Sequence, residues 1–272
     1  MHDPALGGDG EGEGRGTGYG VRGFGGKGVR GVVGRYRRGV SSEVTGRLAA
    51  VRERVERAAR VVGRDPDDVR ILLAVKAQTG DVVRQAVLDG AHLLGHNRAQ
   101  ELLAMAPDLA GVPHEMHFIG RLQSNKATKV VPLVSCVQSV DGLALAQRLD
   151  RLAGEAGRVL DVFVQVNTSG ETSKAGSAPE GALELAVGVG HLPHLRLRGL
   201  MTIGANSADV DVVRASYERL ARLRDDVLAS GAPGTGEARE LSMGMSRDLE
   251  VAVAAGATMV RVGTAVFGGR PA

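Results

Sequence analysis

The chain has 272 residues, of which 43% are hydrophobic and 24% are charged, and its formal net charge is +3. This size suits one large globular domain or two small ones. The sequence has no uninterrupted run of about 18 apolar residues and no secretory signal with a cleavage site. We therefore expect no membrane partner and a cytoplasmic location.

The first 40 residues differ in composition from the rest of the chain. They contain 15 glycines, and seven basic residues stand against four acidic ones, so this segment alone carries the net charge of +3. Such a composition cannot bury enough apolar surface to offset the entropy lost on ordering. We predict a disordered tail over residues 1–40. Residues 41–272 are neutral overall, which argues against a nucleic-acid partner.

From residue 41 onward, amphipathic stretches alternate with short runs rich in Val, Ile and Leu, a pattern typical of parallel strands buried on both faces. Helical patterns cover residues 43–62, before the first strand, and later 141–155, 179–190, 209–229 and 247–255. Eight runs are predicted as strands: 70–76, 92–95, 115–119, 134–139, 160–166, 197–203, 239–243 and 258–262.

Eight strand–helix units within residues 41–272 predict a single (β/α)₈ TIM barrel. The alternative fold is a doubly wound open sheet. Eight strands would make that sheet unusually wide, and the sequence lacks the early Gly-x-Gly-x-x-Gly turn that such folds use to bind dinucleotides. In a barrel, functional groups gather where the strands end, at the C-terminal face.

Lys76 ends the first predicted strand, directly after an apolar run over residues 71–75. It is one of only five lysines in the chain. We predict that it is partly desolvated, because burial favours the free amine that forms an imine with an aldehyde. The alternative is a lysine paired with a carboxylate at the mouth of the barrel.

The ends of the seventh and eighth strands carry groups that phosphate sites use. Gly263 lets backbone N–H groups approach an anion, and Thr264 adds a hydroxyl. Ser246 stands at the start of the helical pattern over 247–255. Neighbouring seventh and eighth loops of a barrel commonly form a phosphate site. The alternative is that Ser246 only caps its helix and Gly263 only turns the chain.

Three other reactive residues carry weaker signals. Cys136 is the only cysteine, and its apolar neighbours indicate a buried thiol. His96 and His117 have no Cys, Asp or Glu at metal-ligand spacing, so we expect no metal site.

Five stretches together resemble one known family: 117–126 (HFIGRLQSNK), 165–167 (QVN), 198–201 (RGLM), 242–250 (SMGMSRDLE) and 259–268 (MVRVGTAVFG). The sequence is similar in them to the pyridoxal phosphate homeostasis proteins, which are related to the N-terminal barrel of alanine racemase. The similarity extends from about residue 48 to residue 269. It implies a fold type III barrel that binds pyridoxal 5′-phosphate (PLP).

The resemblance also implies a role for each site residue. Lys76 would form a Schiff base with PLP, and Arg261 would face the pyridine nitrogen. An arginine stays protonated and leaves that nitrogen without a proton, so the cofactor is a poorer electron sink. The remaining residues implied for the site are those that bind the phosphate, Ser246, Gly263 and Thr264, and those that line the same pocket, Asn97, Met243 and Gly244.

The chain departs from the family pattern around the lysine. Val75, Ala77 and Thr79 flank Lys76 where the family usually has Ser, Thr and Pro. His96 stands where the family has Glu in a Gly-Glu-Asn sequence. The spacing from the lysine to the asparagine is the same.

The function that the resemblance implies is a non-catalytic carrier. It would hold PLP, keep the aldehyde from modifying other amines and pass it to apo-enzymes that depend on PLP, and so balance vitamin B6 pools. We also expect a monomer.

Two kinds of enzyme are the alternatives. The first is a PLP-dependent amino-acid racemase or aldolase. A racemase resembling alanine racemase needs a catalytic tyrosine from a second domain, whereas this sequence ends at Ala272, and its tyrosines are Tyr19, Tyr36 and Tyr217. The second is a phosphosugar enzyme without PLP, which would need paired carboxylates at the strand ends.

Overall fold

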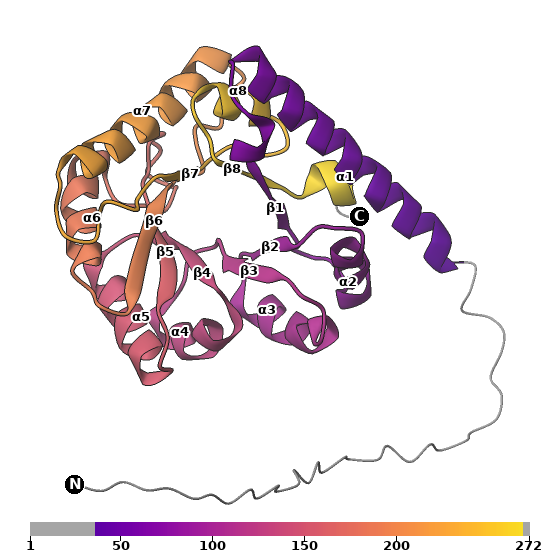
Figure 1. Cartoon of the computed structure of the whole chain (residues 1–272), viewed down its shortest axis with the longest axis horizontal. Coiled ribbons are helices and arrows are strands. Elements are labelled where there is room, and N and C mark those ends of the chain that lie inside the picture. Colours follow the sequence, from indigo (N-terminus) through magenta and orange to yellow (C-terminus); the bar gives the residue numbers. More distant parts are fainter. Residues whose placement is uncertain (1–35, 269–272) are drawn as a thin grey trace, which may run out of the picture.

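The computed structural model describes residues 36–268, and the side chains from residue 43 onward. Eight parallel strands close into a barrel in sequence order (Figure 1). The strands are β1 (Arg70–Ala74), β2 (Leu93–His96), β3 (Glu115–Phe118), β4 (Cys136–Val140), β5 (Leu160–Gln165), β6 (Leu195–Met201), β7 (Glu240–Ser242) and β8 (Met259–Val262).

Helices follow the strands and surround the barrel (Figure 1). The α-helices are α1 (Tyr36–Val61), α2 (Gly80–Leu88), α3 (Ala99–Met105), α4 (Ser124–Val130), α5 (Leu143–Glu155), α6 (Ala182–Gly190), α7 (Val210–Ala229), α8 (Leu249–Ala254) and α9 (Thr264–Phe267). Short 3₁₀ helices lie in the connections: η1 (Pro66–Asp68), η2 (Ala106–Leu109), η3 (Val131–Leu133) and η4 (Pro179–Gly181). In the described part of the chain, no helix is long and apolar enough to cross a membrane.

The predicted barrel is confirmed, and all eight predicted strands are present. Pairing of β1 with β8, which aligns Leu73 with Val262, closes the sheet and rules out the open doubly wound alternative. Helix α1 begins at Tyr36, inside the segment predicted as a tail. The rest of that prediction, residues 1–35, lies outside the described residues.

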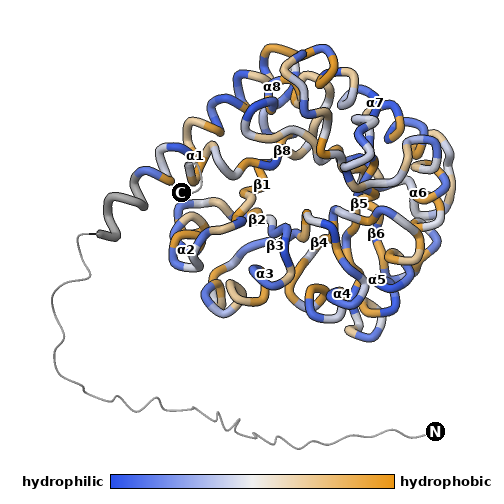
Figure 2. The backbone as a smooth tube through the Cα atoms, turned by 180° about the vertical axis from the view of Figure 1, so that it is seen from behind, coloured by the Kyte–Doolittle hydropathy of each residue, from blue (hydrophilic) through white to orange (hydrophobic). Residues whose placement is uncertain are grey.

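The hydrophobic core has two layers, because side chains of a strand point alternately to its two faces. The larger layer fills the space between strands and helices, and in Figure 2 orange and blue residues alternate along the helices that cover it. The smaller layer fills the inside of the barrel with Leu72, Leu93, Cys136, Phe163, Met201 and Met259. Cys136 is the buried thiol that the sequence predicts, and burial raises its pKa well above the usual value.

Helix α1 packs across α8 and α9, beside the junction of β1 and β8 (Figure 1). Val44, Leu48, Val51 and Val55 recur every three to four residues and are all buried, as expected for the inner stripe of an amphipathic helix. Arg54 adds two hydrogen bonds to the carboxylate of Glu250 in α8. Helix α1 therefore packs against the two helices that follow β7 and β8.

Candidate functional site

Lys76 lies in a tight turn directly after β1. Val75 N donates to Gly95 O of β2 at 3.0 Å, and Gln78 N donates to Val75 O at 3.3 Å. The strand ends at Ala74, and Lys76 lies in the turn beyond it. The side chain of Lys76 is exposed. The predicted partial desolvation is therefore wrong. Among the described residues no carboxylate forms an ion pair with Lys76, so the structure does not favour the paired alternative either.

The end of β8 lies against the end of β1. A Cβ on Gly263 would lie 3.0 Å from Ala74 O, two residues before Lys76. Gly263 is followed at once by the first turn of α9, which begins at the exposed residue Thr264. The lysine and the predicted phosphate-binding pair thus stand at neighbouring strand ends on the C-terminal face.

Ser246 joins the seventh loop to the eighth. Its Oγ accepts a hydrogen bond from Ala265 N at 3.2 Å. Helix α8 begins at Leu249, with Asp248 as its N-cap position, so Ser246 is not a helix cap and the helix starts two residues later than predicted. The serine hydroxyl therefore lies at the first turn of α9, close to Thr264.

The loop after β7 is held in one shape. Gly244 has a φ of 88°, and a Cβ there would lie 2.3 Å from Ala252 Cβ, so only glycine fits without a shift. Its carbonyl accepts from Arg261 N at 2.9 Å. The Met243 side chain is fully buried in the core between strands and helices. Both residues, predicted to line the site, follow the end of β7, but the Met243 side chain lies in the core, so Met243 has only its backbone in the loop.

Arg261 points into the barrel from β8. Its side chain is 6% exposed, one guanidinium nitrogen donates to Ser242 Oγ at 2.9 Å, and the other terminal nitrogen donates to Thr202 O at 2.7 Å. Burial lowers its pKa from the usual value, but an arginine starts so high that it stays charged. A fixed positive charge with further N–H donors therefore lies below the mouth of the barrel.

Asn97 follows β2 and is partly buried. Its Oδ1 atom is buried and has no hydrogen-bond partner among the described residues. A cavity of about 710 Å³ lies beside it, lined also by Arg121 and Gln123 from the loop after β3 and by Lys126 of α4. A buried amide oxygen without a partner is unusual in a folded protein, and a bound ligand that donates a hydrogen bond would satisfy it.

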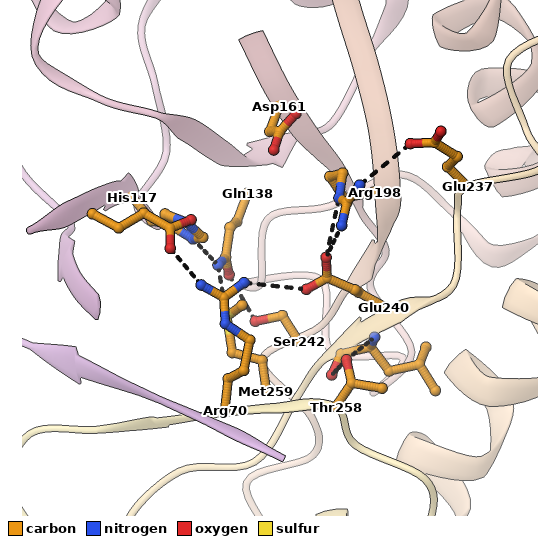
Figure 3. Close-up of polar contacts among 12 residues, drawn as sticks. Arg70, His117, Gln138, Asp161, Arg198, Glu237, Glu240, Ser242, Thr258 and Met259 are labelled. Atoms are coloured by element: carbon orange, nitrogen blue, oxygen red, sulfur yellow. Dashed lines mark hydrogen bonds and ion pairs between the residues drawn. The ribbon is translucent and has the colours of Figure 1, made fainter. Parts of the chain in front are cut away.

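A chain of hydrogen bonds runs from Arg261 through the inside of the barrel. Figure 3 shows three of its members, Ser242, Gln138 and His117. Ser242 Oγ accepts from Arg261 and donates to Gln138 Oε1 at 2.7 Å. Gln138 Nε2 donates to His117 Nδ1 at 2.7 Å. Because Nδ1 accepts this bond, a neutral His117 carries its proton on Nε2. His117 Nε2 then donates to Glu115 Oε1 at 2.8 Å. Each group in this chain is both fixed and satisfied by its neighbours.

Charged side chains close the lower end of the barrel. The guanidinium of Arg70 pairs with the carboxylates of Glu115 and Glu240. In Figure 3 Arg198 lies between Glu240 and Glu237. These pairs sit at the beginnings of the strands, the end of a barrel where polar groups usually serve stability.

Glu115 is expected to make folding sensitive to acid. Its hydrogen bond from His117 is the main cause that lowers its pKa from 4.5 to about 2, and Arg70 acts in the same direction. Since the folded-state pKa is the lower one, the carboxylate stabilises the fold above pH 4.5, and this contribution is lost as the pH falls toward 2. Urea denaturation between pH 6 and pH 2 should show a smaller loss of stability in Glu115→Gln than in the wild type. Equal losses in both proteins would contradict this role.

Two features of the site were missed by the sequence analysis. The hydrogen-bonded chain to Glu115 joins residues from four strands that are far apart in the sequence. Tyr217 of α7 is fully buried, and its hydroxyl donates to Asp248 Oδ2 at 2.9 Å, a contact between two residues 31 positions apart. Burial and the neighbouring Asp248 raise its pKa above the usual value.

Comparison with known proteins agrees with the fold. The family model for the alanine racemase N-terminal domain matches residues 47–271. A pyridoxal phosphate homeostasis protein of Pseudomonas aeruginosa is 43% identical over 229 residues, which cover 84% of this chain and 96% of the relative. The chain belongs to the pyridoxal phosphate homeostasis protein family.

Solved structures also resemble this family member. The crystal structure of an unknown protein from Bifidobacterium adolescentis superposes with a TM-score of 0.80 at 40% identity, over 85% of this chain and 96% of that one. PipY of Synechococcus elongatus, solved with PLP bound, superposes with a TM-score of 0.73 at 33% identity, over 83% of this chain and all of PipY. The fold type III barrel predicted from the sequence is confirmed.

Proposed function

We propose that this protein binds PLP and carries it without catalysing a reaction on it, as part of intracellular vitamin B6 balance. Lys76 holds the aldehyde as a Schiff base. The loops with Ser246, Gly263 and Thr264 hold the phosphate, and Arg261 faces the pyridine nitrogen. Asn97, Gly244 and the backbone of Met243 line the rest of the pocket.

One observation carries this proposal: a lysine and a glycine–threonine pair end neighbouring strands, β1 and β8, in a chain of this family. A phosphorylated aldehyde needs these two groups at the two ends of one small ligand. PipY, which has PLP bound, shares 33% of its residues with this chain along its whole length. The pairing of β1 with β8, which closes the barrel, brings the lysine after the first strand next to the glycine–threonine pair after the last strand.

The residues present fit this cofactor. Asn97 Oδ1 is a buried acceptor without a described partner, directly after β2, the strand that pairs with β1. Arg261 is a fixed donor that stays charged, so it suits an unprotonated ring nitrogen. When bound, PLP supplies an electron sink, and an unprotonated ring weakens that sink. This agrees with holding the aldehyde rather than activating an amino acid.

Tyr217, the one tyrosine whose side chain the structure describes, gives no support to racemase chemistry. Among the described residues the buried hydroxyl of Tyr217 is already engaged by Asp248. The cytoplasmic location, the monomeric state and transfer of PLP to apo-enzymes belong to the same proposal.

The test is the visible spectrum of purified protein mixed with PLP, before and after borohydride, followed by peptide mapping. We expect a band of a protonated lysine imine that borohydride traps on Lys76. The loaded protein should then restore activity to a PLP-dependent apo-enzyme and should turn over no amino acid.

Other outcomes would contradict this function. Rapid racemisation or cleavage of an amino acid by the loaded protein would favour the enzyme alternative. Absence of the band, with inorganic phosphate still bound at the Ser246 loop, would sink the PLP proposal and favour a phosphosugar enzyme.

A further inference from the structure

The turn that carries Lys76 has an unfavourable backbone. Ala77 has a φ of 57° and is the only non-glycine residue with a positive φ in the described part of the chain. Lys76 and Ala77 are the second and third residues of a turn closed by Gln78 N and Val75 O. A positive φ at the third position of a turn normally calls for glycine. For alanine this conformation is disfavoured by a factor of roughly five to thirty.

A carboxylate from the next unit of the barrel holds this turn. Ala77 N donates to Glu101 Oε2 at 3.3 Å. Glu101 lies in the first turn of α3, and its other oxygen accepts from Arg98 at 3.4 Å. Because α3 follows β2, which pairs with β1, the carboxylate is anchored beside the turn by the sheet itself. The contact therefore stabilises the conformation of Ala77 that alanine alone would avoid.

A buried histidine forms the wall behind this carboxylate. His96 is fully buried, its Nε2 lies 3.3 Å from Met105 Sδ, and its Nδ1 has no hydrogen-bond partner among the described residues. That Nδ1 lies 4.0 Å from Glu101 Oε2. Burial lowers the pKa of His96, which favours the neutral ring. With its proton on Nε2, the ring does not donate to Glu101. Glu101 Oε2 accepts the hydrogen bond from Ala77 N instead.

We propose that Glu101 is a positioning residue for Lys76: by accepting the N–H of Ala77 it keeps the turn in the conformation that presents the lysine amine to an aldehyde. This inference rests on the proposed function of Lys76. The Glu101 carboxylate accepts from Ala77 N and Arg98 and, in this proposal, would contact neither the aldehyde nor the phosphate. Its effect should therefore be confined to the step that joins lysine and aldehyde.

The experiment compares binding of PLP with binding of pyridoxine 5′-phosphate, which has the same ring and phosphate but no aldehyde. In Glu101→Ala we expect the affinity for PLP, measured from the imine band, to fall about five- to thirtyfold. The affinity for pyridoxine 5′-phosphate should not change. In the unliganded protein, hydrogen exchange of the Ala77 amide should become faster in this variant.

Three further variants separate positioning from general structure. Glu101→Gln keeps an oxygen that accepts from Ala77 and should keep most of the imine. Arg98→Ala removes the other partner of the same carboxylate and is the matched control, with unchanged imine formation. The double variant Glu101→Ala with Ala77→Gly should recover most of the lost affinity, because glycine adopts a positive φ without strain.

Several results would overturn the positioning role. These are wild-type imine formation in Glu101→Ala, an equal loss of affinity for both ligands, or no recovery in the double variant. A wild-type protein that gives no borohydride adduct on Lys76 would overturn the proposed function and this inference together. A normal wild-type adduct with an unaltered Glu101→Ala variant would overturn the positioning role alone.

Discussion

Lys76→Ala is expected to lose the imine band completely and to give no borohydride adduct, while unfolding at the same urea concentration as the wild type. The side chain of Lys76 is exposed, so its removal should change the free energy of unfolding by less than about 0.5 kcal/mol. PLP should still bind weakly through its phosphate, since the loops with Ser246 and Gly263 are untouched.

The matched control for this variant is Lys129→Ala. Lys129 is an exposed lysine on α4, outside the predicted site. It should keep the full imine band, and peptide mapping should find the adduct on Lys76. An imine band that persists in Lys76→Ala would show that another amine binds the aldehyde and would refute the assignment.

Gln138→Leu is expected to destabilise the protein by about 2–5 kcal/mol, because it leaves the buried His117 Nδ1 without its donor and the buried Ser242 hydroxyl without its acceptor. Gln138 is fully buried and bridges His117 Nδ1 and Ser242 Oγ. A leucine fills similar space but can pair with neither. The free energy of unfolding from urea denaturation measures the effect.

Two comparisons show whether the loss comes from this network. Gln147→Leu, at an exposed position on α5, should change stability by less than about 0.5 kcal/mol. The double variant with His117→Leu should cost less than the sum of the two single changes, since the unpaired ring nitrogen is then gone. A loss below about 1 kcal/mol in Gln138→Leu would mean that these bonds contribute little.

Loss of the Gln138 hydrogen bonds should also weaken the binding of PLP. Ser242 accepts from Arg261 while it donates to Gln138. Once Gln138 is gone, the serine hydroxyl can rotate, and Arg261 loses part of its support. We therefore expect weaker PLP binding in Gln138→Leu than in Gln147→Leu, measured by titration of the imine band.

Much of the fold could be predicted from the sequence, because it depends on local patterns. Runs of Val, Ile and Leu mark strands buried on both faces, and amphipathic stretches mark the helices that cover them. The positions of Lys76, Gly263 and Thr264 at strand ends follow directly, since all strand ends of a barrel meet on one face. Family membership could also be predicted, because it rests on matched stretches of residues.

Other features depend on contacts between residues far apart in the sequence. The exposure of Lys76 comes from a turn whose third residue, Ala77, has a positive φ that nothing in its neighbours signals. Its carboxylate partner, Glu101, lies 24 residues later. Local propensity carries no information about such a pair, because the pairing of β1 with β2 brings it together.

The sequence by itself thus determined the eight strand–helix units, the face on which function lies and the lysine and phosphate-binding residues proposed for it. Only the tertiary structure decided how these groups are supported. The path from Arg261 through Ser242 and Gln138 spans 104 residues between the last two alone. It exists because closing the barrel turns alternate side chains of every strand toward one shared interior, where buried polar groups must find partners in each other.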